Sequence, residues 1–277
     1  MHAIHRSHYR IRFAEDHGDI VRAQELRHVA FIENRPGARP RPDGLDRDAF
    51  DDVCRHLLIE DEVSGTLVAC FRLLPLSCGE EIGRSYTAQF YDLSALRAYG
   101  APVIEMGRFC TRPGWRDPTI LRLAWGAVAN VVDEYDAGLL FGCSSFTGAS
   151  YAAHAAALDL LAARHLAPAH WMPGIKAPRV VSFADRARAD RARADRARHH
   201  EGDSREAFAA LPPLLRSYLG LGGWVSDHAV IDTDLDTLHV FTGLEIDRIP
   251  PQRARRLREV LPDTPLSPAL AEVTSSG

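Results

Sequence analysis

Apolar and β-favouring residues gather in short runs bounded by turn-forming residues, and such runs predict β-strands. Some alternate with polar residues, as Tyr9–Phe13 does, whereas Leu139–Cys143 is apolar throughout. The other runs of this kind are His56–Glu60, Leu67–Leu74, Val103–Thr111, Ala229–Asp232 and His239–Leu244. The turn residues 61–65 separate the run His56–Glu60 from the run Leu67–Leu74, so we expect these two runs to form a hairpin.

Between these runs, apolar residues recur at helical spacing. Asp19 is a suitable N-cap for a helix from Ile20 to about Ile32, and Asp117-Pro118 opens a second helix that ends at Gly138. Further helices are expected near Tyr151–His165, at Leu211–Leu219 and after Pro250-Pro251. This order of elements predicts an α/β fold, in which helices flank a mixed central sheet around one core.

Three segments fall outside the pattern. Residues 34–47 are rich in proline and glycine and form a long loop, which in a compact domain is functional or disordered, and residues 75–100 are an irregular connection. Residues 184–198 repeat Ala-Asp-Arg-Ala-Arg, either as a solvated helical insertion or as a basic surface for an acidic carrier protein or an anionic membrane. We therefore expect one domain over residues 9–250, with this insertion, and a tail over residues 251–277.

The run Val103–Thr111 carries a glutamate and an arginine near its middle, which a half-buried strand has little reason to contain. Alternation places Glu105 on one face of the strand and Arg108 on the other. Gly107 lies between them, where a β-bulge would redirect Arg108 and leave a backbone N–H group available. Two interpretations stay open: an ordinary core strand with a structural ion pair, or a functional site.

Two more places carry charge in an unexpected setting. Asp48 and Asp51 flank Phe50 directly after the long loop, either as a solvated turn with an N-cap or as an acidic mouth for a cationic substrate. Arg72 lies inside an otherwise apolar run, where an arginine more often faces solvent or pairs structurally than binds a ligand.

Composition narrows the class of protein. The 277 residues suffice for a full hydrophobic core, and a net charge of −4 does not favour nucleic-acid binding. The 5 cysteines are scattered without a Cys-x-x-Cys pair, which argues against disulfides and a zinc site and fits a reducing compartment. We find neither a signal peptide nor a run of about 20 apolar residues that could span a membrane. We expect a cytoplasmic protein, with peripheral membrane contact at most.

The segment Arg112–Pro118 joins a strand to a helix, and the free N–H groups at such a helix start often bind phosphate. Its single glycine and its prolines make it poor material for a nucleotide pyrophosphate, whereas Arg112 and Arg116 could still meet a single phosphate. The sequence contains no Walker, G-x-G-x-x-G or G-x-S-x-G pattern, which weakens the kinase, dehydrogenase and serine-hydrolase interpretations.

Several of these motifs together resemble the signature of the acyl-homoserine-lactone synthases and their relatives, which have the GNAT acyltransferase fold. They are Arg27-x-x-x-Phe31, Asp48-Ala49-Phe50-Asp51, Arg72-Leu73-Leu74-Pro75 and Glu105-Met106-Gly107-Arg108-Phe109. Two further stretches, Leu140–Gly148 and Leu211–Leu215 running into Ala229–Asp232, resemble the ornithine Nα-acyltransferases that make lyso-ornithine lipid. The resemblance covers residues 9–250, and the Ala-Asp-Arg-Ala-Arg repeat is not part of it.

The resemblance implies transfer of a 3-hydroxyacyl chain from acyl carrier protein to the α-amine of L-ornithine. Glu105 would take the proton from that amine, directly or through water. The other substrate-binding and catalytic residues would be Asp48, Asp51, Arg72, Arg27, Phe31 and Arg108. Of these, the aspartates would hold the cationic amines of ornithine, and Arg108 or Arg72 its carboxylate. No metal or other cofactor is implied, because the phosphopantetheine arm of the carrier protein holds the acyl donor.

The remaining implied residues serve the acyl donor. Backbone N–H groups near Gly107–Phe109 would stabilise the oxyanion. The acyl chain and pantetheine arm would contact Phe109, Cys110, Thr111, Ser144 and Phe146, and the acidic carrier protein would dock near Arg112, Arg116 and Arg122. Phe109 stands where the ornithine branch would have a smaller residue, so a lactone synthase that uses S-adenosylmethionine stays open. A non-enzymatic GNAT-like binding module, with purely structural carboxylates, is a further alternative.

Overall fold

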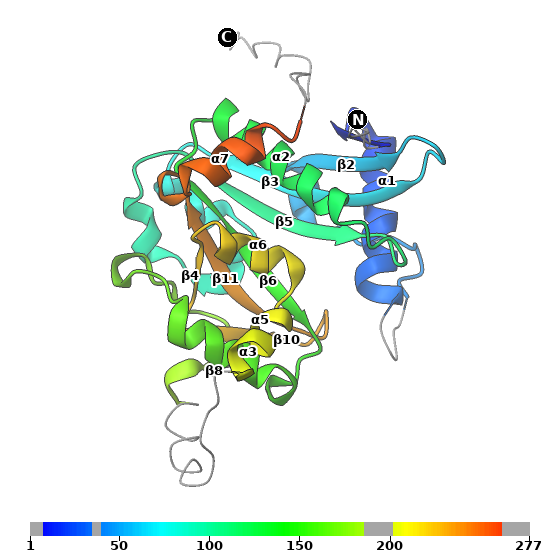
Figure 1. Cartoon of the computed structure of the whole chain (residues 1–277). Helices are drawn as coiled ribbons and strands as arrows, with labels where there is room; N and C mark the ends of the chain where they lie inside the picture. The colour runs from blue at the N-terminus through cyan, green and yellow to red at the C-terminus, as the bar shows by residue number, and fades with distance from the viewer. Residues whose placement is uncertain (1–7, 35–39, 186–201, 262–277) are drawn as a thin grey trace, which may run out of the picture. The chain divides into compact units, whose positions relative to one another are not determined.

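The computed structural model describes residues 8–34, 40–185 and 202–261 (Figure 1). They fall into two compact units, each built from separate stretches of the chain. The first unit takes its residues from Met1–Arg72, Arg108–Val131 and Ala254–Gly277, and the second from Leu73–Gly107 and Val132–Arg253. Strands β3 (Leu67–Leu76) and β5 (Val103–Thr111) both run from one unit into the other.

In the first unit, strand β1 (Tyr9–Phe13) pairs antiparallel with β2 (Arg55–Asp61), and β3 follows β2 in the sheet. Helix α1 (His17–His28) continues as the π-helix Val29–Glu33. Its apolar side packs on the strands in a buried cluster of Ala23, Leu26, Leu58, Leu67, Cys70 and Cys110. The 3₁₀ helix η2 (Ala49–Asp52) lies between α1 and β2 in the chain.

In the second unit, the strand order is β5, β6 (Leu139–Thr147), β11 (Thr237–Glu245), β10 (His228–Asp232) and β8 (Val180–Ser182). Strand β9 (Trp224–Val225) pairs with β11. The β5–β6 pair is parallel and runs from Val103 opposite Leu139 to Glu105 opposite Phe141, where the register ends. By contrast, β11 pairs antiparallel with β6, β9 and β10, and β10 pairs antiparallel with β8, so the sheet is mixed.

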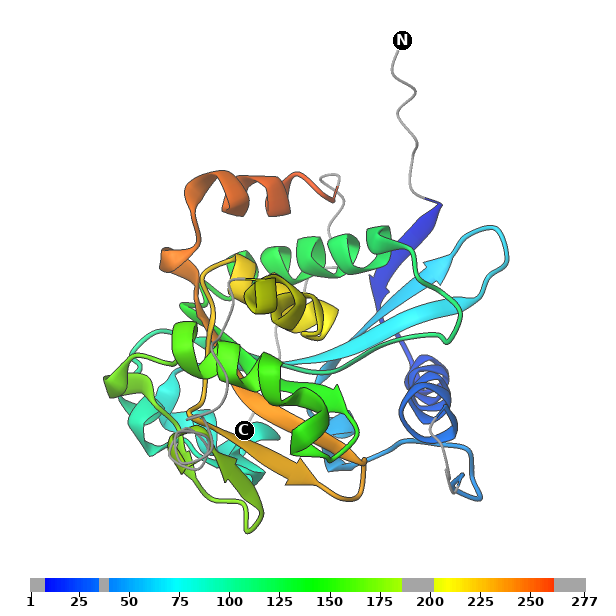
Figure 2. The same cartoon turned by 60° about the horizontal axis from the view of Figure 1, so that its bottom comes forward.

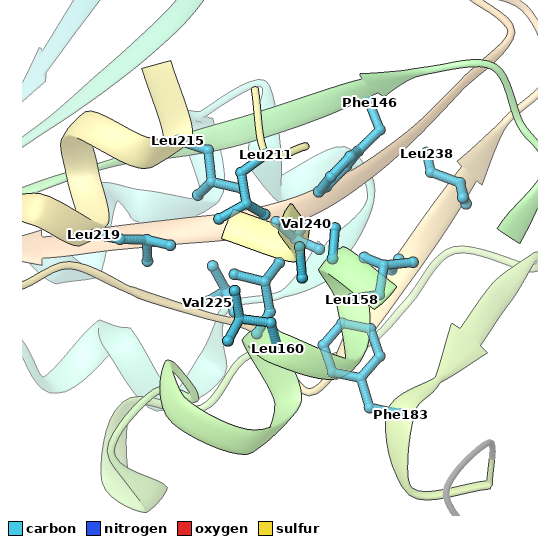
Figure 3. Close-up of a cluster of buried hydrophobic side chains, with 14 residues drawn as sticks. Phe146, Leu158, Leu160, Phe183, Leu211, Leu215, Leu219, Val225, Leu238 and Val240 are labelled. Carbon is cyan, nitrogen blue, oxygen red and sulfur yellow. The ribbon is translucent and has the colours of Figure 1, made fainter. Parts of the chain in front are cut away.

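Three helices cover one face of the second unit's sheet: α3 (Tyr151–Arg164), α5 (Gly202–Ala209) and α6 (Pro213–Gly220) (Figure 2). Side chains from these helices and from the strands form one dry cluster (Figure 3). Its labelled members are Phe146, Leu158, Leu160, Phe183, Leu211, Leu215, Leu219, Val225, Leu238 and Val240. Burial of apolar surface of this kind is the main term that stabilises a domain.

The connection from β3 to β5 is built from short elements. They are the 3₁₀ helices Gly79–Arg84, Thr87–Gln89 (η4) and Ser94–Ala98, and strand β4 (Tyr91–Asp92), which pairs with β7 (Gly174–Ile175). The elements still to be placed in the chain are α2 (Pro118–Glu134), the 3₁₀ helices Ala169–Trp171 and Ile246–Arg248, and α7 (Pro251–Arg258). In the part of the chain described, no helix combines the length and the apolar character needed to cross a membrane.

Most predicted elements are confirmed, but the start of the first helix is wrong. Helix α1 begins at His17 and is capped by Asp16, whose extended backbone lets its carboxylate accept the N–H of Asp19 (2.8 Å). Asp19 is therefore in the first turn, and its carboxylate binds Arg12 (Nη2···Oδ1 2.8 Å) and Arg22 (3.2 Å). Asp16 takes the cap position, whereas Asp19 pairs with Arg12 of strand β1.

The predicted end of the strand at Cys143 is also wrong, because β6 continues to Thr147. Ser144 and Ser145, which follow the predicted end, pair with Val240 and His239 of β11. Serine is a poor strand former by itself, so the long neighbouring strand decides its conformation. The repeat beyond Asp185 and the tail from residue 262 lie outside the described residues.

Replacing Gly142 by alanine should weaken the β5–β6 pair. A Cβ atom there would come within 2.2 Å of the carbonyl oxygen of Met106, which is backbone and cannot rotate away. We expect the Gly142→Ala variant to lose about 1–3 kcal/mol of unfolding free energy in urea titrations. Gly107→Ala is the matched control on the neighbouring strand, because a Cβ there meets no heavy atom within 4 Å. Equal stability of the two variants would contradict the close approach.

Candidate functional site

Charged side chains that the sequence spreads over four segments meet inside the first unit. We call them the arginine–aspartate network: Arg27, Asp46, Asp48, Asp51, Arg72 and Arg108. These segments are helix α1, the loop that runs into η2 together with η2, strand β3 and strand β5. Burying a charge is costly unless it is paired and hydrogen-bonded, and here every aspartate has an arginine partner.

Asp51 lies at the centre of this network and has a side chain only 5% exposed. Its carboxylate accepts hydrogen bonds from Arg27 (Nη2 at 2.9 and 2.8 Å) and from Arg72 (Nη1 at 2.8 Å). Gln24 adds a further donor at 2.9 Å. All these donors lie on elements other than η2, so Asp51 ties α1 and β3 to that turn.

Asp48 is the N-cap of η2, where its carboxylate accepts the N–H of Phe50 (2.9 Å). It also receives two hydrogen bonds from Arg72, at 2.6 and 3.1 Å, and one from Arg108 at 3.1 Å. In contrast to Asp51, its side chain is 24% exposed. Asp48 is therefore the aspartate of this network that solvent, or a ligand, reaches most readily.

The arginines keep the network ionised. Burial alone would raise the pKa of Asp51, but the charges of Arg27 and Arg72 outweigh burial and lower it to about 2. The pKa of Asp48 is likewise lowered, because Arg72 and Arg108 outweigh the effect of burial. Burial lowers the pKa of the adjacent His56, so this imidazole is neutral while its Nε2 lies 3.0 Å from the carbonyl oxygen of Asp51.

Arg108 has an unusual backbone conformation for a residue within a strand. Its φ of 54° lies in the left-handed region, which costs a non-glycine residue about 1–3 kcal/mol. The guanidinium is held by Asp48 (3.1 Å) and Asp46 (3.4 Å), which keeps the residue in this conformation. The sequence predicted the irregularity at Gly107, whose φ is not positive, so it occurs one residue later.

Glu105 lies in the second unit and is 4% exposed. Each oxygen of its carboxylate accepts a backbone N–H: Oε2 from Tyr86 (2.9 Å) and Oε1 from Thr87 (2.7 Å). These amides stand at the start of the 3₁₀ helix η4, where N–H groups lack partners within the helix. Burial and then the negative charge of Glu105 raise the pKa of Tyr218, which comes from α6. Glu105 is thus a buried carboxylate fixed by main-chain donors.

The predicted acyl-binding residues occupy different environments. The ring of Phe109 contacts that of Phe71 (centroids 5.9 Å apart), and the thiols of Cys110 and Cys70 are 3.6 Å apart; Thr111 ends strand β5. Ser144 is buried and accepts a hydrogen bond from Thr242 (2.9 Å), while Phe146 belongs to the cluster beneath α3, α5 and α6. The contact of these five residues with an acyl chain stays a prediction.

Phe31 lies in the π-helix that follows α1 and packs against the buried cluster of the first unit. Of the predicted docking residues, Arg116 and Arg122 are exposed. Arg112 is half-buried, and its Nε donates to the carbonyl oxygen of Leu67 (2.8 Å), so part of this guanidinium is already engaged.

Sequence reasoning missed Asp46, Gln24 and His56. Asp46 is buried within the loop 34–47, where its carboxylate binds Arg27 (Nε at 3.2 Å). A proline- and glycine-rich loop gives no signal that one of its carboxylates is buried. Gln24, by contrast, lies one turn before Arg27 on α1, and this helical spacing could have pointed to it.

Replacing Asp51 by asparagine should destabilise the protein strongly. The variant leaves Arg27 and Arg72 buried without their shared countercharge, and we expect a loss of about 3–5 kcal/mol in urea unfolding at pH 7. The pKa of Asp51 is about 2 in the folded protein and 3.8, the ordinary aspartate value, in the unfolded chain, so its stabilisation is complete above pH 3.8 and disappears as the pH falls through 2. The gap between wild type and Asp51→Asn should narrow over that interval. Asp52→Asn, an exposed neighbour in the same turn, is the control; a gap independent of pH would contradict the ionic role.

Comparison with known proteins agrees with this geometry. Residues 26–126 match the acetyltransferase (GNAT) domain family. The L-ornithine N(alpha)-acyltransferase of Rhodobacter capsulatus is 36% identical over 240 residues, which are 84% of this chain and 88% of that protein. The protein of the same name from Brucella abortus is 32% identical over 251 residues, 86% of this chain and 85% of its own length.

Among solved structures, TofI in complex with an inhibitor and MTA covers 92% of this chain and 100% of its own, at 14% identity and a TM-score of 0.46, which is too distant to inform the site. The sequence relatives, in contrast, match over most of both chains. The mixed α/β sheet and flanking helices predicted from sequence are confirmed as a GNAT-like fold. The chain is an acyltransferase and belongs to the L-ornithine N(alpha)-acyltransferase family.

Proposed function

We propose that this enzyme transfers a 3-hydroxyacyl chain from acyl carrier protein to the α-amine of L-ornithine and so forms lyso-ornithine lipid. The observation that carries the proposal is the 36% identity to an L-ornithine N(alpha)-acyltransferase over most of both chains. The sequence supports it as well, because a buried carboxylate, Glu105, and an arginine, Arg108, stand three residues apart on β5.

In this reaction the amine nitrogen attacks the thioester carbon of the acyl donor. The new C–N bond forms, the C–S bond breaks, and the carrier protein leaves as its free pantetheine thiol. The α-ammonium must first lose a proton, which we assign to Glu105, directly or through one water. The two amides that bind Glu105 each hold one oxygen of its carboxylate and so fix its orientation.

For binding ornithine, we assign the direct contacts to Asp48 and Arg108. These are the more accessible members of the arginine–aspartate network, with side chains 24% and 13% exposed. Asp48 suits a cationic amine, and the guanidinium of Arg108 suits the carboxylate. Arg27, Asp51 and Arg72 are almost fully buried and already paired, so we assign them the task of holding Asp48 and Arg108 in place. We assign Phe31 a packing role, because it lies against the buried cluster that holds Ala23 and Leu26 of α1.

The carrier protein is the proposed donor partner, and arginines on the first unit are its proposed docking surface. Arg116 and Arg122 are exposed there. Helix α7 adds Arg255, Arg256 and Arg258, which are exposed as well. Val260 directly follows α7 and lies against Gly126 of α2. Gly126 is one helical turn beyond Arg122, so the arginines of α7 adjoin those near α2. Such a surface complements an acidic protein. We place the enzyme in the cytoplasm, with peripheral membrane contact as a further proposal.

The reaction can be tested with purified protein, a 3-hydroxyacyl carrier protein and either L-ornithine or S-adenosylmethionine. We expect mass spectrometry to detect acyl-ornithine from the first mixture and no product from the second. The Glu105→Gln variant should turn over about a hundredfold more slowly or worse, because its amide cannot accept the proton.

Acyl-homoserine lactone as the product would overturn ornithine as the acceptor, and no product from either mixture would leave a binding module. Full activity of Glu105→Gln would refute the base assignment. Its circular dichroism spectrum serves as the control, since a variant that does not fold would instead make Glu105 a structural residue.

Carrier docking has its own test, in which Arg122 is replaced by glutamate. Reversing this charge should raise KM for the acyl carrier protein about fivefold at low salt, because charge complementarity mainly speeds encounter. KM for ornithine should not change. Arg97→Glu reverses an exposed arginine of the second unit and is the matched control. If both variants raise KM for the carrier equally, the effect reflects net charge and the docking surface is wrongly placed.

A further inference from the structure

Lys176 is the single lysine of the chain, and it reaches the turn that binds Glu105. Its ammonium donates to the carbonyl oxygen of Ala88 (Nζ···O 2.6 Å). The backbone beside it is fixed to the same segment, since Ile175 pairs with Tyr91 and the N–H of Ala177 donates to the carbonyl of Phe90 (2.9 Å). Lys176 is therefore held close to η4 by its neighbours before its own side chain contributes.

The turn that Lys176 contacts has Glu105 at its other end. Tyr86 and Thr87 point their N–H groups at the carboxylate of Glu105, and Gln89 closes the turn by donating to the carbonyl of Tyr86 (3.0 Å). In a helical turn the peptide dipoles align, with the N–H end positive and the carbonyl end negative. An anion thus lies at the positive end and a cation at the negative end of one turn.

The turn is also fixed to the sheet. Tyr91, which is fully buried, donates its hydroxyl hydrogen to the backbone carbonyl of His239 on β11 (2.9 Å). Ser85 accepts the N–H of Ala88 on its hydroxyl oxygen (3.2 Å) and so caps the turn at its start. The turn 86–90 is therefore held by contacts on both sides, with Lys176 at the carbonyl of Ala88 and Glu105 at the two amides.

We propose that Lys176 is a positioning residue for the reaction: its ammonium holds the turn 86–90 so that the amides of Tyr86 and Thr87 stay aimed at Glu105. Because Lys176 acts through Glu105, this role rests on the proposed function. The ammonium of Lys176 also strengthens the positive potential that the turn exerts on the carboxylate of Glu105.

Several other titratable groups lie beside this arrangement: the thiol of Cys143 is 3.5 Å from the hydroxyl of Thr87, and His239 packs edge-on against Phe90. The pKa of Asp92 is lowered, first by its hydrogen bonds with Ser94 and then by the charge of Lys176. Tyr218 faces Glu105 from α6, and burial raises its pKa, so it stays neutral at physiological pH. Asp92 therefore supplies the competing explanation, in which Lys176 does no more than balance a surface carboxylate.

The test compares Lys176→Met with Lys176→Arg in the acyl-ornithine assay. We expect kcat of Lys176→Met to fall about fivefold, in line with the usual strength of a cation at a helix C-terminus, with KM for both substrates unchanged. The acid limb of its pH profile should move to higher pH, because the Glu105 carboxylate loses support for its charged form. Lys176→Arg keeps a cationic donor and should restore both the rate and the profile.

Two controls exclude simpler causes. Arg179→Met removes an exposed cation three residues along the same segment and should leave kcat and the pH profile unchanged. Asp92→Asn removes the competing partner and should also leave the profile unchanged. If Asp92→Asn reproduces the effect of Lys176→Met, Lys176 serves Asp92 and the proposal is wrong.

The single lysine allows a chemical test on the unmodified sequence as well. Treatment with an amine-acetylating ester should lower kcat of the wild type about fivefold, as expected for Lys176→Met. The Lys176→Arg variant keeps only the N-terminal amine, so its kcat should not change on treatment. Full activity of acetylated wild type, or equal loss in Lys176→Met and Lys176→Arg, would overturn the proposal. A wild type that makes no acyl-ornithine at all would instead refute the proposed function, so the two failures are distinguishable.

Discussion

The ionic contacts of Asp51 are the constraint on which the first unit depends. The carboxylate of Asp51 and the guanidinium groups of Arg27 and Arg72 are buried together. Removing one of these partners costs more stability than the complete set adds relative to an apolar core. The arrangement therefore specifies geometry rather than adding much stability: α1, η2 and β3 must meet where Arg27, Asp51 and Arg72 meet. Asp48 and Arg108 inherit their positions from this centre, which explains how a partly exposed carboxylate can be held so firmly.

Glu105 is fixed by a different kind of contact. The aspartates of the first unit bind guanidinium groups, which carry full charges, whereas Glu105 binds the amides of Tyr86 and Thr87, which carry only partial ones. Backbone donors orient a carboxylate without neutralising it. The amides stabilise the charged form of the carboxylate, as a cation would, but they place no full charge beside it. The irregular segment between β3 and β5 thus supplies Glu105 of β5 with main-chain donors.

Much of the fold follows from local sequence patterns. Strand β5, helix α2 and helix α3 lie where periodicity and turn residues predicted them, because their side chains are strongly apolar on the side that packs. The errors occurred where local preference was weak. Helix α1 is capped by Asp16 rather than by Asp19, and the serines of β6 lie in a strand because β11 runs beside them. The motif residues of the network were found from sequence, but their partners Asp46 and Gln24 were not.

By itself, then, the sequence determined the order and type of the main elements and the fold class, and it singled out most of the charged residues of the network. These properties depend on short-range periodicity and on residue chemistry, both of which are legible along the chain. Only the tertiary structure decided which charges pair, that the left-handed conformation falls on Arg108, and that Glu105 is held by amides of a distant turn. Each of these depends on contacts between residues far apart in the chain, where the cost of burial selects one arrangement among many that the sequence allows.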